Sequence, residues 1–375
     1  MRSVRSVLLV GLLALTGCGK FFQPETGGGG GTTSGDLLYV ANSNASNLTI
    51  AGFTIASAKL SVTNSSPYSV GVTPYSVAVT PDNAFLYVGT LAGIYVYTIN
   101  SDGSLTVGNS GTPVGSSGAV AMKVDTTGGY LLAADTSPAA YLYTINSDGT
   151  LTADGSAVPL DSGNTSHMVI SPSDQLVYIS LGTGGVDILT FDNGSATLSK
   201  TNLRIPPRSS GNSDAGLATD PNGKYLFVTE TGVNGVRMMN IGSTGNVTEV
   251  SGSPFKTGLG PSSVMVDDTG AYVYVTNRTD GTVSGFTLTT SGTLSALSGS
   301  PFAINNSSGK ANAASAPVDI VEDNTSTYVA VACAGGSPDL AVFNFDTTTL
   351  GKLDSFATAT TGSDPTQVSA VAATH

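Results

Sequence analysis

Few side chains of this chain are suited to acid–base chemistry. Among its 375 residues there are two histidines, and His167 lies well inside the sequence. A neutral imidazole can take a proton from water, and a nearby cation can stabilise the oxyanion that forms when this water attacks a carbonyl carbon. We assign the cationic role to Arg204 or Arg208. These residues would support metal-independent hydrolysis of an ester-like bond.

A second interpretation of the same residues stays open. His167 could instead be a hydrogen-bonding residue that lines a channel, with the two arginines as solvated loop charges. Other charged residues occur in loops that we expect on the same face of the molecule. As candidate ligand-binding residues we select those next to the expected channel: Asp214, Arg278, Asp280 and Asp339.

Charge is scarce throughout the chain. Only 11% of the residues are charged and the net charge is −12, whereas soluble domains average about 25% charged residues. An acidic chain cannot neutralise phosphates, so nucleic-acid partners are excluded. Two cysteines and two histidines are too few for a Cys/His metal centre. We expect neither a metal nor a cofactor.

The first residues are typical of an export signal. Arg2 and Arg5 precede an apolar run at 7–15 that is too short to span a bilayer as a helix. The run ends in Leu15-Thr16-Gly17-Cys18, which resembles the lipobox of bacterial lipoproteins. We therefore expect residues 1–17 to be a signal peptide and residues 18–35 to be a lipidated Cys18 followed by a flexible, glycine-rich tether.

Such processing has consequences for charge and location. Cleavage after Gly17 removes two arginines and changes the net charge from −12 to −14. The protein would be exported and anchored to a membrane of the bacterial cell envelope through the lipid on Cys18. Gly19 rather than Asp follows the cysteine, which favours the outer membrane in a cell that has one. Cys333 is left without a disulfide partner, and we expect it to be a small buried hydrophobe.

One strand motif, rich in Tyr, Val and Leu, occurs seven times. The spacing of its copies is roughly 48 residues, which predicts a ring or an array of similar units rather than several unlike domains. The aligned centres of the seven copies are Tyr39, Tyr87, Leu132, Tyr178, Phe227, Tyr274 and Ala330.

Each unit has turn signals that divide it into four antiparallel strands. In the second unit, the turn at 81–83 precedes the Tyr-Val strand, and Asn-Ser-Asp-Gly at 100–103 precedes a short fourth strand. Four-stranded units in a ring form a β-propeller. We predict an all-β, seven-bladed and monomeric propeller over residues 36–375. The segment 364–371 should pair with the N-terminal blade and close the ring.

The motif Tyr274-Val275-Thr276-Asn277 and the sevenfold period resemble the lactonase-type seven-bladed propellers with YVTN-type repeats. This family includes 6-phosphogluconolactonase-like proteins, and the resemblance covers essentially all of residues 36–375. It implies hydrolysis of a lactone.

The family's catalytic landmarks match in part. A family histidine opens the first strand of a middle blade, and His167 has this position. The Gly-Pro-Arg-His stretch of the next blade corresponds to Ser-Asp-Ala-Gly at 213–216, which lacks the Arg and the His. A family glutamate is approximated by Glu230. The resemblance thus implies that His167 and Glu230 are catalytic, whereas the cationic role of Arg204 or Arg208 rests on the position of these residues in the loop before the fifth blade.

Two functions remain open at this point. One is an envelope-anchored hydrolase of a sugar-type or other small lactone. We expect this lactone to be neutral, because an acidic protein repels anionic substrates. The alternative is a non-catalytic surface propeller that binds a carbohydrate, a peptide or an envelope protein.

Overall fold

The computed structural model describes residues 36–44, 47–56, 59–115, 118–304, 315–335, 339–359 and 368–375. They belong to one compact unit, Gly31–His375. The predicted signal peptide, Cys18 and the tether lie outside the described residues. The helical segments among the described residues are two short 3-10 turns, η1 (Asn109–Gly111) and η2 (Thr231–Val233). No described helix is long and apolar enough to cross a membrane.

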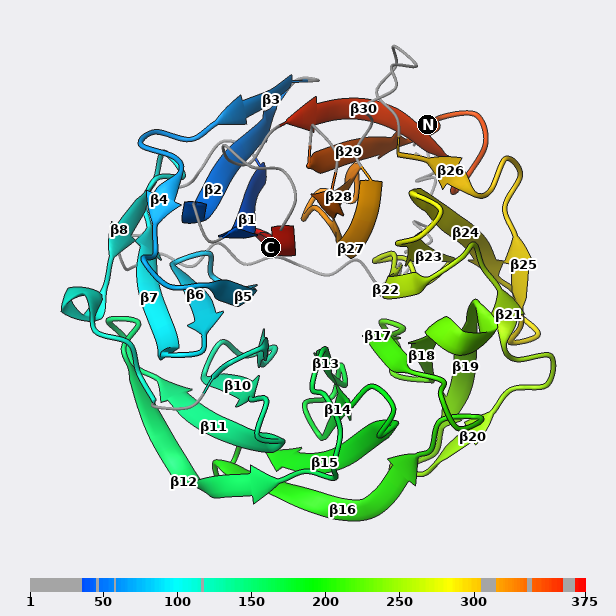
Figure 1. The fold of residues 1–375 in the computed structure, drawn as a ribbon, viewed down its shortest axis with the longest axis horizontal. Helices are drawn as coiled ribbons and strands as arrows, with labels where there is room; N and C mark the ends of the chain where they lie inside the picture. The colour runs from blue at the N-terminus through cyan, green and yellow to red at the C-terminus, as the bar shows by residue number, and fades with distance from the viewer. Residues whose placement is uncertain are drawn as a thin grey trace, which may run out of the picture. The chain divides into compact units, whose positions relative to one another are not determined.

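The strands form seven antiparallel sheets arranged as blades around a common centre, as Figure 1 shows. From the inner to the outer strand, blade A contains β31 (Val368–Ala373), β1 (Asp36–Asn44), β2 (Asn47–Ala56) and β3 (Lys59–Val62), with β4 (Tyr68–Ser69) beside β2. Blade B contains β5 (Pro74–Val79), β6 (Phe85–Thr90), β7 (Gly93–Ile99) and β8 (Leu105–Val107). Blade C contains β9 (Ala121–Val124), β10 (Tyr130–Ala134), β11 (Ala139–Ile145) and β12 (Leu151–Pro159).

The other four blades repeat this order. Blade D contains β13 (Met168–Ile170), β14 (Leu176–Ser180), β15 (Val186–Asp192) and β16 (Thr197–Ile205). Blade E contains β17 (Asp214–Thr219), β18 (Tyr225–Glu230), β19 (Gly235–Ile241), β20 (Val247–Glu249) and β21 (Phe255–Lys256). Blade F contains β22 (Pro261–Val266), β23 (Tyr272–Asn277), β24 (Thr282–Leu288), β25 (Leu294–Ala296) and β26 (Phe302–Ala303). Blade G contains β27 (Ser315–Glu322), β28 (Tyr328–Gly335), β29 (Leu340–Phe345) and β30 (Leu353–Ala359).

The ring is closed between the two ends of the sequence, as predicted. β31 pairs antiparallel with β1, with Ala370 opposite Ala41, and becomes the innermost strand of blade A. The observed strand begins at Val368; residues 364–367 of the predicted strand lie outside the described residues. His375 donates its backbone N–H to Asn83 Oδ1 (2.8 Å) on blade B. Asn324 of blade G donates its Nδ2–H to the carbonyl of His375 (2.8 Å), so closure ties blades A, B and G together.

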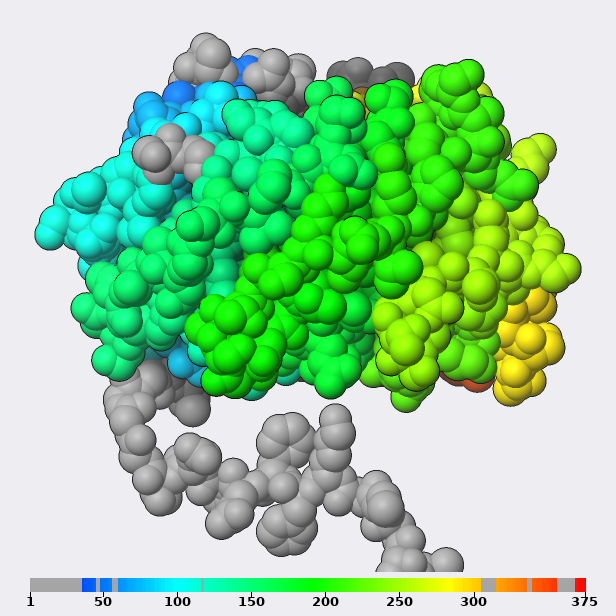
Figure 2. All heavy atoms as spheres, turned by 90° about the horizontal axis from the view of Figure 1, so that it is seen from below, coloured from blue at the N-terminus to red at the C-terminus, as the bar shows by residue number. Residues whose placement is uncertain are grey.

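The antiparallel order gives the propeller two distinct faces. The blade-to-blade connections and the loops between second and third strands lie on one face, which we call the connecting face. The turns between first and second strands and between third and fourth strands lie on the other, which we call the hairpin face. Figure 2 shows the outer wall between the two faces, with the teal, green and yellow-green residues of blades C, D and E side by side.

The second strand of each blade is covered on both sides because a blade packs against each of its faces. In blade B, the consecutive residues Leu86, Tyr87 and Val88 are all 0% exposed. A strand buried on both faces needs no polar alternation. This explains why the repeated motif is a continuous run of Tyr, Val and Leu.

A tyrosine at the centre of the motif links neighbouring blades. Tyr87 of blade B donates its hydroxyl hydrogen to the carbonyl of Gly149 in blade C (3.0 Å). Tyr39 makes the same bond to Gly103 (2.9 Å) between blades A and B. Gly149 has φ of 80°, and a Cβ there would lie 2.3 Å from the Phe85 ring. We call this contact the tyrosine–glycine latch.

Candidate functional site

Blades D and G bring His167 and Asp319 to the same level of the inner wall. His167 stands opposite Ser180, whose N–H donates to its carbonyl (3.0 Å), and Asp319 pairs with Ala332. Ser180 and Ala332 both lie two residues after the centre of the repeat motif. The equivalent positions of the other blades hold small residues, which are Ala370, Ser76, Ala121, Gly216 and Ser263.

The backbone of His167 is held by a hydroxyl of the neighbouring strand. His167 donates its N–H to Ser180 Oγ (3.0 Å). In blade E the equivalent N–H of Gly216 donates to Thr229 Oγ1 (2.8 Å), beside a shift in the pairing register. The hydroxyls satisfy N–H groups that the irregular strand would otherwise leave unpaired. They also fix the point from which the His167 side chain extends.

The imidazole of His167 is half-buried. Its Nδ1 is enclosed and has no hydrogen-bond partner among the described residues, so Nε2 is the nitrogen left for water or a ligand. Burial lowers the pKa of His167, the Asp319 carboxylate opposes this shift, and the Lys123 ammonium adds to it. His167 is therefore neutral at neutral pH, which is the state that accepts a proton.

Asp319 and Lys123 are the charged residues that act on His167. Asp319 Oδ1 accepts a hydrogen bond from Ser263 Oγ (3.1 Å), and Oδ2 accepts one from the N–H of Val371 (3.0 Å), so blades F and A both hold this carboxylate. Lys123 on β9 is exposed. Lys123 pairs with Leu132, the centre of its motif, whereas His167 stands opposite a residue two positions after the centre. Lys123 therefore lies two residues nearer to the hairpin face than His167.

A second charged cluster lies within blade E, around the buried Arg237. Arg237 Nη2 lies 3.2 Å from Glu249 Oε2, and Nη1 lies 3.8 Å from Asp214 Oδ2. Asp214 is 0% exposed, and its carboxylate oxygens have no hydrogen-bond partner among the described residues. Burial raises the pKa of Asp214 to about 7; Arg237 opposes this shift, and Glu230 and Glu249 add to it.

Arg208 and Glu230 hold the segment that precedes blade E. Glu230, which is 0% exposed, accepts hydrogen bonds at Oε1 from the backbone N–H of Arg208 (2.9 Å) and from Asn212 Nδ2 (3.2 Å). Arg208 Nη1 donates to Glu249 Oε1 (2.8 Å) and to the carbonyl of Ser253 (3.0 Å). Arg208, Glu230 and Asp214 thus come together as a network of blade E.

Arg204 belongs to a separate network on blade D. Its Nη1 lies 3.3 Å from Asp161 Oδ2, and its Nη2 donates to the carbonyl of Gly184. Lys200 bridges Asp161 (2.5 Å) and the buried Asp187 (3.1 Å). The guanidinium of Arg204 is therefore held against the carboxylate of Asp161, in the segment before blade D.

The three candidates of blades F and G lie in separate surroundings. Arg278 is exposed after β23, and Asp280 Oδ2 accepts the N–H of Leu259 (2.7 Å). Asp339 is 0% exposed, and its carbonyl accepts the N–H of Cys333 (2.8 Å). Cys333 is buried, as predicted, and burial together with the Asp339 charge raises the pKa of its thiol.

The sequence interpretation missed four charged residues that complete these sites. Lys123 and Asp319 surround His167, while Arg237 and Glu249 complete the blade E cluster. Asp319 could have been found by counting, since it precedes the turn residue Asp323 by the same four positions that separate His167 from its turn. Arg237 lies in an otherwise apolar strand and carries no such signal. No cluster of three or more potential metal-ligating His, Cys, Asp or Glu side chains occurs within the described part of the chain.

Comparison with known proteins agrees with this architecture. The family described as "Lactonase, 7-bladed beta-propeller" matches residues 37–370. No curated protein matches the chain significantly.

Solved structures with the same fold share little sequence with the chain. A putative 6-phosphogluconolactonase from Bacteroides uniformis is 15% identical with a TM-score of 0.74, over 91% of this chain and 100% of that one. The periplasmic gluconolactonase PpgL of Pseudomonas aeruginosa is 17% identical with a TM-score of 0.68, over 91% of this chain and 99% of that one. At these identities the structures show the fold alone. The family match spans nearly the whole propeller, and the chain therefore belongs to the lactonase family of seven-bladed β-propellers.

Proposed function

We propose that this protein is an envelope-anchored lactonase that hydrolyses a small, neutral lactone of the sugar type, with His167 as the general base. The observation that carries the proposal is the half-buried, neutral imidazole of His167 on the inner wall, whose Nδ1 is enclosed and whose pKa is influenced by the charges of Asp319 and Lys123. Membership of the lactonase family supports the reaction class.

The reaction needs one proton acceptor and one stabilising charge. His167 takes a proton from water while the water oxygen attacks the lactone carbonyl carbon, which gives a tetrahedral oxyanion and an imidazolium. When the oxyanion collapses, the ring C–O bond breaks and the leaving alkoxide takes the proton back from the imidazolium. The product is an open-chain hydroxy acid, and His167 is neutral again.

Lys123 and Asp319 are suited to the supporting roles. The ammonium of Lys123 is exposed and its charge acts on His167, so it can stabilise the oxyanion electrostatically. Asp319 is fixed by hydrogen bonds from three backbone or hydroxyl donors, and its charge favours the imidazolium. The predicted Arg204 and Arg208 are already paired with carboxylates, and Glu230 anchors the backbone of a connecting segment.

Charge supports a neutral substrate. The mature chain would carry a net charge of −14 if it is processed after Gly17. Where the family carries an arginine before blade E, this chain has the uncharged Ala215. An anionic phosphosugar would be repelled by this field, whereas a neutral hydroxylated lactone would not. The periplasmic gluconolactonase among the structural neighbours is consistent with a sugar-type lactone outside the cytoplasm.

The anchoring part of the proposal rests on the sequence before the propeller. The apolar run at 7–15 and the cysteine at position 18 favour export and lipidation. Mass spectrometry of the protein purified from membranes tests this directly. A diacylated or triacylated Cys18 at the N-terminus is expected, and an intact leader would contradict it.

Hydrolysis of a lactone panel tests the catalytic part. We expect the mature protein to open glucono-δ-lactone or galactono-γ-lactone faster than a phosphorylated gluconolactone. His167→Ala should lower kcat/KM by about 100-fold or more, while His375→Ala, the other histidine, serves as the matched control. Unchanged hydrolysis by His167→Ala would refute His167 as the base. Absence of hydrolysis on every lactone would favour the binding propeller.

A further inference from the structure

The interface between blades D and E departs from the latch pattern. Tyr178 occupies the latch position of blade D, and Gly245 in the turn between β19 and β20 is the matching glycine of blade E. The Tyr178 hydroxyl is buried but has no hydrogen-bond partner among the described residues, unlike those of Tyr87 and Tyr274. The blade E turn is therefore not tied to Tyr178.

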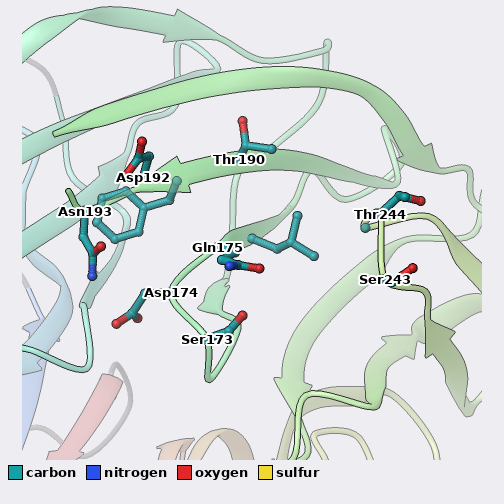
Figure 3. Close-up of a pocket in the computed structure, with 11 residues that line it drawn as sticks. Ser173, Asp174, Gln175, Thr190, Asp192, Asn193, Ser243 and Thr244 are labelled. Atoms are coloured by element: carbon teal, nitrogen blue, oxygen red, sulfur yellow. The ribbon is translucent and has the colours of Figure 1, made fainter. Parts of the chain in front are cut away.

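A pocket of about 450 Å³ opens beside this turn on the hairpin face. Figure 3 shows Ser173 and Gln175 of blade D on one side and Ser243 and Thr244 of blade E on the other. The turn that follows β15, with Asn193, forms a further wall. Pockets of a few hundred Å³ are of the size that holds one or two sugar units.

Three lining side chains have unused hydrogen-bonding groups. The amides of Gln175 and Asn193 and the hydroxyl of Ser243 have no hydrogen-bond partner among the described residues. An amide offers a carbonyl oxygen and two N–H donors, so it can accept from one hydroxyl of a ligand and donate to the next. This combination suits a ligand with neighbouring hydroxyl groups.

The carboxylates of the pocket are already occupied. Asp192 accepts hydrogen bonds from the N–H of Gly194 (3.0 Å) and from Ser195 Oγ (2.7 Å). Asp174 reaches away to blade C, where it accepts a hydrogen bond from the N–H of Thr126 (3.2 Å). No lysine or arginine lines the pocket. The charge of the lining is therefore that of its two carboxylates, and no cation is present there to bind an anion.

The apolar part of the lining is small and rigid. Phe191 is 3% exposed and meets Tyr130 edge-to-face, with ring centroids 5.6 Å apart. Leu176 is half-buried, and a Cβ on Gly245 would lie 2.9 Å from its side chain. Phe191 is almost inaccessible, so Leu176 offers the apolar surface against which the C–H face of a sugar ring can pack while the amides bind its hydroxyls.

We infer that this pocket between blades D and E binds a neutral carbohydrate, as a site separate from His167. The free amides, the free hydroxyl and the absence of lining cations carry this inference together, and the two carboxylates already accept hydrogen bonds from the protein itself. The pocket lies on the hairpin face, whereas His167 lies at the connecting end of β13, so a carbohydrate could occupy the pocket while a lactone is hydrolysed.

Titration of the mature protein with neutral trisaccharides tests the inference. Maltotriose, cellotriose, xylotriose and chitotriose are followed by calorimetry, with trigalacturonate as the anionic comparison and a tripeptide of serine and asparagine as the peptide comparison. At least one neutral trisaccharide should bind. The double variant Gln175→Ala, Asn193→Ala should weaken binding at least tenfold, and Ser243→Trp, which fills the pocket, should abolish it.

Matched controls separate this site from general surface effects. Asn222→Ala removes an exposed amide from the blade E turn of the same face and should leave the affinity unchanged, as should His167→Ala. The inference is overturned if no neutral trisaccharide binds up to about 10 mM, if the pocket variants bind as well as the parent, or if only trigalacturonate or the peptide binds. A loss of hydrolysis in His167→Ala with retained sugar binding would keep the two sites distinct.

Discussion

Tyr274 of blade F donates its hydroxyl hydrogen to the carbonyl of Gly351 in blade G at 2.6 Å, and both residues are buried. The bond joins the centre of one repeat to the turn before the last strand of the next. Burial chiefly raises the pKa of the Tyr274 hydroxyl, and the charges of Asp267 and Glu322 add to the shift. The hydroxyl therefore stays protonated and can donate.

We expect Tyr274→Phe to lower the free energy of unfolding by about 1–2 kcal/mol, because it leaves the buried carbonyl of Gly351 without a donor. Urea denaturation followed by circular dichroism measures the change. Tyr178→Phe is the matched control, since the Tyr178 hydroxyl has no hydrogen-bond partner among the described residues. It should be neutral or slightly stabilising. Equal destabilisation by both substitutions would show that the bond to Gly351 is not the source of the stability that the Tyr274 hydroxyl provides.

Removal of β31 should abolish cooperative unfolding. Without residues 368–375, blade A loses its innermost strand and β1 gains an unpaired edge. The hydrogen bond from Ser369 Oγ to the carbonyl of Pro74 (2.9 Å) on blade B is lost as well. Thermal melts of the truncated and parent chains make the comparison, with removal of residues 19–30 of the predicted tether as the control. An unchanged melting curve after removal of β31 would contradict closure as a source of stability.

The fold could be predicted because the repeats are explicit. Each tyrosine or leucine of the motif stands in a strand covered on both sides, so selection for burial leaves a recognisable apolar run, such as Leu86-Tyr87-Val88. The turns need glycines with positive φ, such as Gly149, and these mark the turns between the strands of a unit. Apolar runs and turn glycines are set by neighbouring residues in the sequence, so they can be recognised without knowledge of the tertiary structure.

The candidate site could be predicted only in part because it depends on distant registers. The position of His167 at the start of a first strand was readable. Asp319 lies on an inner strand three blades further on; its distance of four residues from the turn residue Asp323 was the available signal, and the observed pairing places both residues at one level. Arg204 and Arg208 were chosen as free cations, but each is paired with a carboxylate. The partners of long side chains depend on the tertiary structure, which the sequence pattern does not report.

Stability should decrease as the pH rises from about 5 to 8, and Glu322 should contribute to this decrease. Burial is the main cause that raises the pKa of Glu322 to about 8, and the negative charges of Asp268, Asp267 and Asp323 add to the shift. The hydrogen bond that Glu322 Oε2 accepts from the N–H of Asp268 (2.8 Å) opposes it. The folded state therefore holds a proton that the unfolded state releases near its ordinary pKa of 4.5. The free energy of unfolding falls through this window and levels off above pH 8.

Glu322→Gln tests this linkage, because it removes the titrating group and should reduce the slope of stability against pH between about 5 and 8. Urea denaturation at several pH values provides the slope. Asp148→Asn is the control: hydrogen bonds from Thr150 lower the pKa of Asp148 on an exposed turn, so its contribution is lost only in acid. An unchanged slope in Glu322→Gln would show that the carboxyl is ionised in the folded protein.

Asp319→Asn and Lys123→Met should shift the pH dependence of lactone hydrolysis in opposite directions. The Asp319 charge raises the pKa of His167 and the Lys123 charge lowers it. A general base works in its neutral form, so kcat/KM rises with pH through the pKa of His167. Asp319→Asn should therefore move this rise to lower pH, and Lys123→Met should move it to higher pH while also lowering kcat, because the oxyanion loses its cation. Asp280→Asn, a change in an exposed loop of blade F, should leave the profile in place. If the profile shifted in the same direction for both variants, the pH dependence of kcat/KM would not follow the ionisation of His167. This result would exclude His167 as the base.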